Sequence, residues 1–133
     1  MTAVMEARHL SKWYGNVLGL SDVSLVLEPG ITGLLGPNGA GKSTFMKLLT
    51  GQMKPNLGQA LVRGERIWNN IALFRDIGYC PEADAFYEEI SGREFLTALV
   101  RFHGLGSREA EERAEKALGI VELLADKDRR IRG

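Results

Sequence analysis

The sequence predicts an α/β fold whose first half is rich in strands and whose second half is helical. The apolar-rich segments 23–27, 31–35 and 60–62 each have a glycine or proline within two residues, as strands often do. From residue 91 onward, apolar residues recur at helical spacing instead. A glycine-rich stretch at 36–41 stands between a strand pattern and a helix pattern. The two halves are therefore joined by a strand–loop–helix unit.

The strand-rich half can be divided into elements. Segment 23–27 alternates between apolar and polar residues before a turn at 28–30, and 31–35 is typical of a strand buried in a parallel sheet. We expect a helix over 42–50 that stops at Gly51, because glycine favours helix C-termini. The remaining elements expected here are a strand at 60–62, a short helix at 69–74 and an apolar strand at 77–80 leading into Pro81.

The helical half begins with a recognisable N-terminal signal. Ser91 and Glu94 have the spacing of a capping box. The helix that follows is expected to end near Gly104 and to carry one apolar stripe, made of Phe95, Leu99 and Phe102. A second helix is expected from Ser107, with alanines and Leu118 on one side and charged residues on the other. Segment 121–126 is interpreted as the end of this helix, because Glu122 interrupts its apolar run.

Composition excludes several classes of protein. The 133 residues fit one domain, and 17 Lys+Arg balance 17 Asp+Glu, which argues against nucleic-acid binding through bulk positive charge. A single cysteine, Cys80, excludes a disulfide framework and a multi-cysteine zinc site, and we expect it to be a small buried apolar residue. No apolar run is long enough to span a membrane and no secretory signal is present, so a cytoplasmic protein is expected. His9 and His103 stand apart from other ligand-type residues and are interpreted as structural.

Residues 36–43 match G-x-x-x-x-G-K-[ST], the phosphate-binding P-loop, in the required position between a strand and a helix. Glycines let the backbone approach phosphates closely, and successive N–H groups at a helix N-terminus favour anions. Lys42 would reach the β- and γ-phosphates, and the Ser43 hydroxyl would ligate Mg²⁺. The alternative is a glycine-rich turn with a solvated lysine. The predicted nucleotide-binding residues in this segment are Gly36, Pro37, Asn38, Gly39, Ala40, Gly41, Lys42, Ser43 and Thr44.

The string LLGPNGAGKST at 34–44 resembles the phosphate loop of ATP-binding cassette (ABC) ATPases. Segments 10–15, 18–25 and 77–82 resemble, in the same order, the aromatic loop, the following strand entry and the strand into the Q-loop of that family. The resemblance implies a P-loop NTPase fold that binds ATP and Mg²⁺. Its expected parts are an antiparallel β subdomain, the P-loop unit and the start of a helical subdomain. We expect 1–133 to be one partial domain, with an ATP-binding core at 1–85 and helical residues at 86–133.

The resemblance also implies roles outside the loop. Tyr14 matches the aromatic residue that stacks on adenine, although a half-buried strand aromatic is the structural alternative. Glu82 stands where the family has glutamine; with Ser43 it is a candidate Mg²⁺ ligand, or else a solvated loop residue. Phe86 and Tyr87, in the polar loop 83–89, lie where the family receives a membrane subunit, or they fold back onto their own core.

Other parts of the family's machinery are not found in the sequence. It has no Ser-Gly-Gly signature after residue 90 and no apolar strand that closes on Asp-Glu, so we expect no catalytic residue in this chain. The chain is expected to be the N-terminal half of its domain. We expect an ATP-binding subunit that, at full length, dimerises and hydrolyses ATP to drive transport by a separate membrane subunit at the inner face of the membrane. An exporter is favoured. The alternatives are a soluble ABC-type ATPase that acts on nucleic acid or ribosomes, a small P-loop kinase and a stand-alone nucleotide-binding module.

Overall fold

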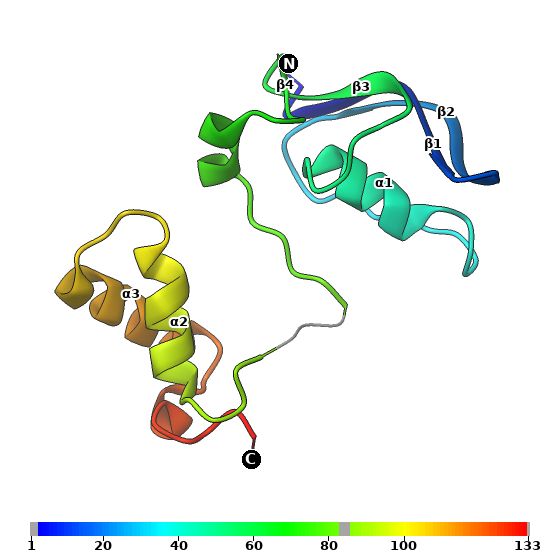
Figure 1. Cartoon of the computed structure of the whole chain (residues 1–133). Helices are drawn as coiled ribbons and strands as arrows, with labels where there is room; N and C mark the ends of the chain where they lie inside the picture. The colour runs from blue at the N-terminus through cyan, green and yellow to red at the C-terminus, as the bar shows by residue number, and fades with distance from the viewer. Residues whose placement is uncertain (1–2, 83–85, 133) are drawn as a thin grey trace. The chain divides into compact units, whose positions relative to one another are not determined.

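The structure is a computed structural model that describes residues 3–82 and 86–132. The chain divides into two compact units, Met1–Tyr79 and Cys80–Gly133, which are described one at a time. Figure 1 labels strands β1 to β4 and helix α1 in the first unit, and helices α2 and α3 in the second. Among the described residues, no helix combines the length and the apolar character needed to cross a membrane.

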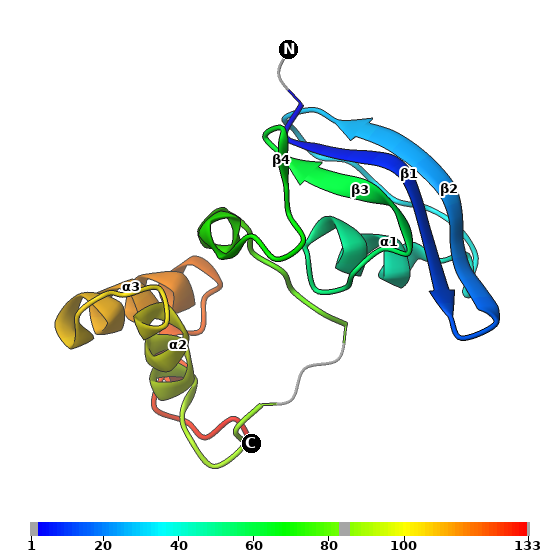
Figure 2. The same ribbon diagram turned by 45° about the horizontal axis from the view of Figure 1, so that its top comes forward.

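The first unit is built on a four-stranded antiparallel sheet in the order β2-β1-β3-β4 (Figure 2). The strands are β1 (Met5–Tyr14), β2 (Val17–Leu27), β3 (Leu57–Val62) and β4 (Glu65–Arg66). β1 and β2 form a hairpin closed by the pairing of Tyr14 with Val17. The strands predicted at 23–27 and 60–62 are confirmed, as parts of β2 and β3. The antiparallel subdomain expected from the family resemblance is therefore present.

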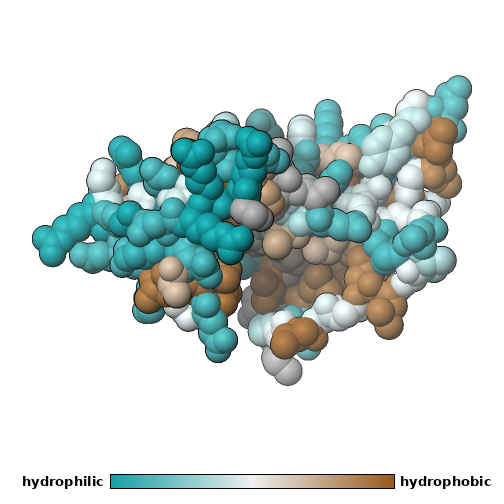
Figure 3. Space-filling model, turned by 90° about the horizontal axis from the view of Figure 1, so that it is seen from below, coloured by the Kyte–Doolittle hydropathy of each residue, from teal (hydrophilic) through white to brown (hydrophobic). Residues whose placement is uncertain are grey.

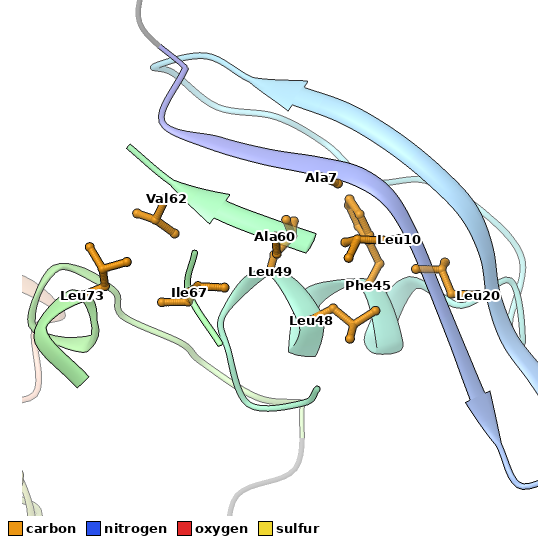
Figure 4. Close-up of a cluster of buried hydrophobic side chains, with 10 residues drawn as sticks. All are labelled: Ala7, Leu10, Leu20, Phe45, Leu48, Leu49, Ala60, Val62, Ile67 and Leu73. Carbon is orange, nitrogen blue, oxygen red and sulfur yellow. The ribbon is translucent and has the colours of Figure 1, made fainter. Parts of the chain in front are cut away.

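Helix α1 (Lys42–Leu49) covers one face of this sheet (Figure 4). Its apolar residues pack onto the inward residues of the strands, and each such side chain contributes about 1.5–3 kcal/mol when fully buried. α1 ends before Gly51, whose backbone is left-handed with φ 72°, so the predicted helix and its stop are confirmed. The buried core consists of Ala7, Leu10, Leu20, Phe45, Leu48, Leu49, Ala60, Val62, Ile67 and Leu73.

The predicted strand at 31–35 is wrong. The structure assigns no strand there, Leu35 is 94% exposed and Ile31 is exposed throughout. A parallel strand is stable only between neighbours that take up its backbone hydrogen bonds. No other part of the chain that the structure describes pairs with this segment. An apolar run shows that a segment favours burial, but it does not supply the partner strand.

Residues 69–80 match the predictions only in part. A 3-10 helix over Ile71–Asp76 confirms the short helix predicted at 69–74. The strand predicted at 77–80 is absent, and Cys80 is exposed rather than buried. Segment 77–80 forms no strand for the same reason as 31–35, because no strand in the described part of the chain pairs with it.

The second unit contains α2 (Gly92–Arg101) and α3 (Ser107–Ile120). The capping box is confirmed: the Ser91 hydroxyl accepts from the Glu94 N–H at 3.2 Å, and a Glu94 carboxylate oxygen accepts from the Ser91 N–H at 2.8 Å. These hydrogen bonds to the carboxylate hold the pKa of Glu94 below its ordinary value. α2 has no fully buried residue, and Phe102, the last of its predicted stripe, is 86% exposed. The buried residues of α3 are Ala110, Ala114 and Leu118.

The prediction that 121–126 forms the end of this helix is wrong, because α3 ends at Ile120. Glu122 is left-handed with φ 61°, and its N–H donates to Gly119 O at 3.2 Å. The Leu123 N–H then donates to Leu118 O at 2.8 Å, which completes a Schellman stop. A single 3-10 turn follows at Leu124–Asp126. The stop was missed because it places glutamate where glycine is usual.

Ion pairs close the second unit. Arg93 contacts Glu111 at 2.9 Å and Asp128 at 2.5 Å, and Lys127 donates to Glu115 at 2.6 Å, which lowers the pKa of Glu115. The C-terminal stretch also pairs with the segment before α2, since Ile131 N–H donates to Ile90 O at 3.0 Å. Hydrophobic residues nevertheless reach the surface among hydrophilic ones, as the face drawn in Figure 3 shows.

Candidate phosphate-binding site

The glycine-rich loop runs directly into the N-terminus of α1. Gly39 and Gly41 have left-handed backbones, with φ 84° and 91°. A side chain at Gly41 would place its Cβ 2.6 Å from the Gly19 carbonyl oxygen of β2. Both the backbone angle and this close approach therefore require glycine at position 41. Within the loop, the Ala40 N–H donates to Pro37 O at 3.2 Å and closes a turn.

The N-terminus of α1 has the electrostatics of an anion site. Gly41 is its N-cap residue and has no side chain to cap the helix, and the first turn contains no acidic residue. The positive end of the helix dipole is therefore not neutralised by a neighbouring carboxylate. The whole of 36–40 is exposed, so the loop is open to a ligand. This arrangement favours a phosphate group.

Lys42 bends back over the loop. Its ammonium group donates to Pro37 O at 2.8 Å and also to Gly36 O. The side chain is half-buried, and the charge is held beside the loop rather than in bulk solvent. Ser43 is exposed and Thr44 is half-buried in the same first turn.

Tyr14 lies at the end of β1, next to the loop. Its hydroxyl oxygen lies 3.0 Å from the Thr44 hydroxyl oxygen and 3.3 Å from the Met53 sulfur. The Tyr14 side chain contacts Gly19, since a Cβ built there would lie 2.6 Å from Tyr14 Cε2. Tyr14 remains 46% exposed. The structure thus brings an accessible aromatic ring beside a phosphate-loop residue 30 positions away.

Sequence reasoning missed three neighbours of this site. Gly19 touches both the Tyr14 ring and Gly41, and a glycine inside a strand is a signal of such close approach. Lys12 lies 6.0 Å from the centre of the Tyr14 ring, a distance at which a cation is attracted to an aromatic face. Met53 follows α1, and nothing in its sequence context indicated contact with Tyr14.

The other predicted site residues belong to the second unit. Glu82 is exposed, and residues 83–85 of the expected contact loop lie outside the described residues. Phe86 packs edge-on against Phe95, with ring centres 5.5 Å apart, while Tyr87 is 74% exposed. In the described ranges, no three His, Cys, Asp or Glu side chains gather as metal ligands. Ser43 and Glu82 belong to different units, so their roles as Mg²⁺ ligands remain two separate predictions.

Comparisons with known proteins agree with this geometry. A family model described as "ABC transporter" matches residues 20–133. The chain is 34% identical to the Nod factor export ATP-binding protein I of Cupriavidus metallidurans, covering 99% of this chain and 44% of that protein. It is 36% identical to the phospholipid-transporting ATPase ABCA3 of Mus musculus, covering 98% of this chain and 8% of that protein.

A solved structure described as an ATP-binding subunit of an ABC transporter is also similar. It superimposes with a TM-score of 0.80 at 31% identity, over 96% of this chain and 54% of that one. The chain therefore spans about half the length of such ATP-binding subunits, and less of the larger transporters.

Proposed function

The chain belongs to the ABC transporter family, and on that premise we propose that its phosphate loop holds Mg-ATP by the residues at 36–44. Members of this family have ATP-binding domains, and the proposal concerns how this chain does so. The observation that carries it is the loop's geometry. Left-handed Gly39 and Gly41 lead into an uncapped helix N-terminus, with the Lys42 ammonium beside them.

Each part of the site has a role in this proposal. Backbone N–H groups of the loop bind the phosphates, and Lys42 moves from the Gly36 and Pro37 carbonyls to the β- and γ-phosphates. The exposed ring of Tyr14 stacks on adenine, a contact worth about 1–3 kcal/mol. The Ser43 hydroxyl is the oxygen ligand proposed for Mg²⁺ in the first unit, and the Glu82 carboxylate is a separate candidate ligand in the second unit. When bound, the ion would neutralise charge on the β- and γ-phosphates.

The protein that contains this chain is proposed to hydrolyse ATP and to energise a membrane subunit from the inner face of the membrane. The exposed aromatic residues Phe86 and Tyr87 support this region as the contact with that subunit. A relative named for Nod factor export supports an export-type parent. The proposed division is an ATP-binding core at 1–85 and helical residues at 86–133, with dimerisation of full-length domains.

The proposal is tested by titrating the chain with a fluorescent Mg-ATP analogue. Lys42→Ala removes a charged hydrogen-bond donor, so the affinity should fall at least about tenfold. Lys47→Ala is the matched control, because Lys47 is an exposed lysine on the same helix. Equal affinities of the two variants would contradict the proposed role of the loop.

A measurement of phosphate release distinguishes nucleotide binding from ATP hydrolysis. Because the sequence has no apolar strand closing on Asp-Glu, we expect this chain to bind nucleotide with negligible phosphate release. Steady Mg²⁺-dependent release that Lys42→Ala abolishes would contradict that expectation.

A further inference from the structure

Two hydroxyl groups meet where the aromatic residue and the phosphate loop come together. The Tyr14 oxygen lies 3.0 Å from the Thr44 oxygen and 3.3 Å from the Met53 sulfur. Tyr14 has one hydroxyl proton for these two possible acceptors. The direction of the Tyr14–Thr44 hydrogen bond therefore determines where the Thr44 proton points.

Acceptor strength favours one direction. A thioether sulfur is a weak acceptor, whereas a hydroxyl oxygen can accept while it donates its own proton elsewhere. When Tyr14 donates to Thr44, the Thr44 proton is left for a further acceptor. Ionised phosphate oxygens accept hydrogen bonds, so a phosphate needs Thr44 as a donor.

Both hydroxyls are held by packed elements. The Tyr14 ring lies against Gly19, and Gly41 at the start of α1 approaches the carbonyl of the same residue. Thr44 precedes buried Phe45, which anchors that turn of α1 in the core. The packing of these neighbours therefore places the Tyr14 ring and the first turn of α1 beside each other.

We infer that Tyr14 is a positioning residue whose hydroxyl donates to Thr44 and thereby fixes the Thr44 hydroxyl as a donor to a nucleotide phosphate. This rests on the proposed function and adds a polar role to the proposed stacking of the Tyr14 ring. Met53 is the acceptor to which the Tyr14 proton turns when Thr44 donates to Tyr14.

Two probes separate the polar role from stacking: Mg-ATP, and inorganic tripolyphosphate with Mg²⁺, which has no base. Binding of each to the 133-residue chain is measured by calorimetry. Tyr14→Phe keeps a ring that can stack but loses the hydroxyl, so it should weaken both probes by the same factor, about three- to tenfold. Tyr79→Phe is the matched control, because it removes a phenol hydroxyl elsewhere in the first unit and should change neither affinity.

Thr44 variants test whether the two hydroxyls act as a pair. Thr44→Val should weaken tripolyphosphate binding, and Tyr14→Phe added to it should have no further effect. Thr44→Ser keeps the hydroxyl and should retain wild-type affinity. Circular dichroism establishes that each variant is folded.

Two outcomes would overturn the inference in distinguishable ways. If Tyr14→Phe binds tripolyphosphate as tightly as the unchanged chain does, the hydroxyl has no polar role, and the proposed nucleotide site stands. If the unchanged chain binds neither probe, the proposed function fails, and the inference fails with it.

Discussion

Different interactions stabilise each of the two units internally. The first unit buries a continuous apolar core between α1 and the sheet, including Leu10, Leu48 and Ile67. In the described part of the second unit, the buried apolar residues are Ala110, Ala114 and Leu118 of α3. Ion pairs around Arg93 and Lys127 connect its segments. Apolar burial is worth more than exposed ion pairs, so the first unit has the stronger basis for rigidity.

The difference has a consequence for the site. The groups proposed to bind nucleotide belong to the unit with the larger core, and Gly19 and Gly41 place them by direct backbone contact. The residues proposed to contact a partner lie on the second unit, where Tyr87 is exposed. Precise positioning is thus associated with the unit that the hydrophobic core stabilises.

The largest expected effect comes from the core of the first unit. Leu48 is 1% exposed, so Leu48→Ala should reduce the free energy of unfolding by about 2–5 kcal/mol. Both tryptophans, Trp13 and Trp68, lie in this unit, and their fluorescence during urea unfolding reports on it specifically. Met46→Ala, at an exposed position of the same helix, should have little effect. Equal losses for the two variants would show that the described core does not stabilise the unit.

A smaller effect is expected at the start of α2. Ser91→Ala removes the capping hydroxyl and should cost about 1 kcal/mol, measured by far-ultraviolet circular dichroism, because α2 and α3 hold most of the α-helical residues. Ser107→Ala is the control, since Ser107 is the first residue of α3 and gives that helix no side-chain cap. The tryptophan fluorescence transition should not move with Ser91→Ala. If the tryptophan fluorescence transition shifts instead of the helical signal, the expectation that Ser91→Ala affects the second unit alone is contradicted.

The smallest expected effect is a dependence of stability on pH. The pKa of Glu94 is lowered in the folded chain by its hydrogen bonds from Ser91, so its carboxylate stabilises the fold above the unfolded pKa of about 4.3. That contribution is lost as the pH falls below this value through the folded pKa. Glu94→Gln can still accept from the Ser91 N–H but carries no charge, so its helical signal should depend less on pH between about 3 and 5. An unchanged pH dependence would assign the acid response to other carboxylates.

Local signals in the sequence predicted the elements that depend on local interactions. The capping box at Ser91 and Glu94, the stop of α1 before Gly51 and the glycines of the phosphate loop all follow from neighbouring residues. Segments 31–35 and 77–80 were mispredicted because strand formation depends on distant partners, which a local pattern does not contain.

The site was predictable to a similar extent. The loop motif identified Lys42 and Ser43, and the family resemblance pointed to Tyr14. The contact between the Tyr14 and Thr44 hydroxyls was not predictable, because it depends on the hairpin turn and on the close approach of Gly19 to the loop. Contacts of this kind are set by tertiary packing rather than by residue type.

Amide chemical shifts measured while Mg-ATP is added test the claim that the first unit contains a phosphate site at 36–44. We predict saturable shifts for the backbone N–H groups of 36–44 and for residues next to Tyr14, with Lys42→Ala weakening the response. Shifts confined to 86–132, or saturable shifts at 36–44 that Lys42→Ala leaves unchanged, would contradict the claim.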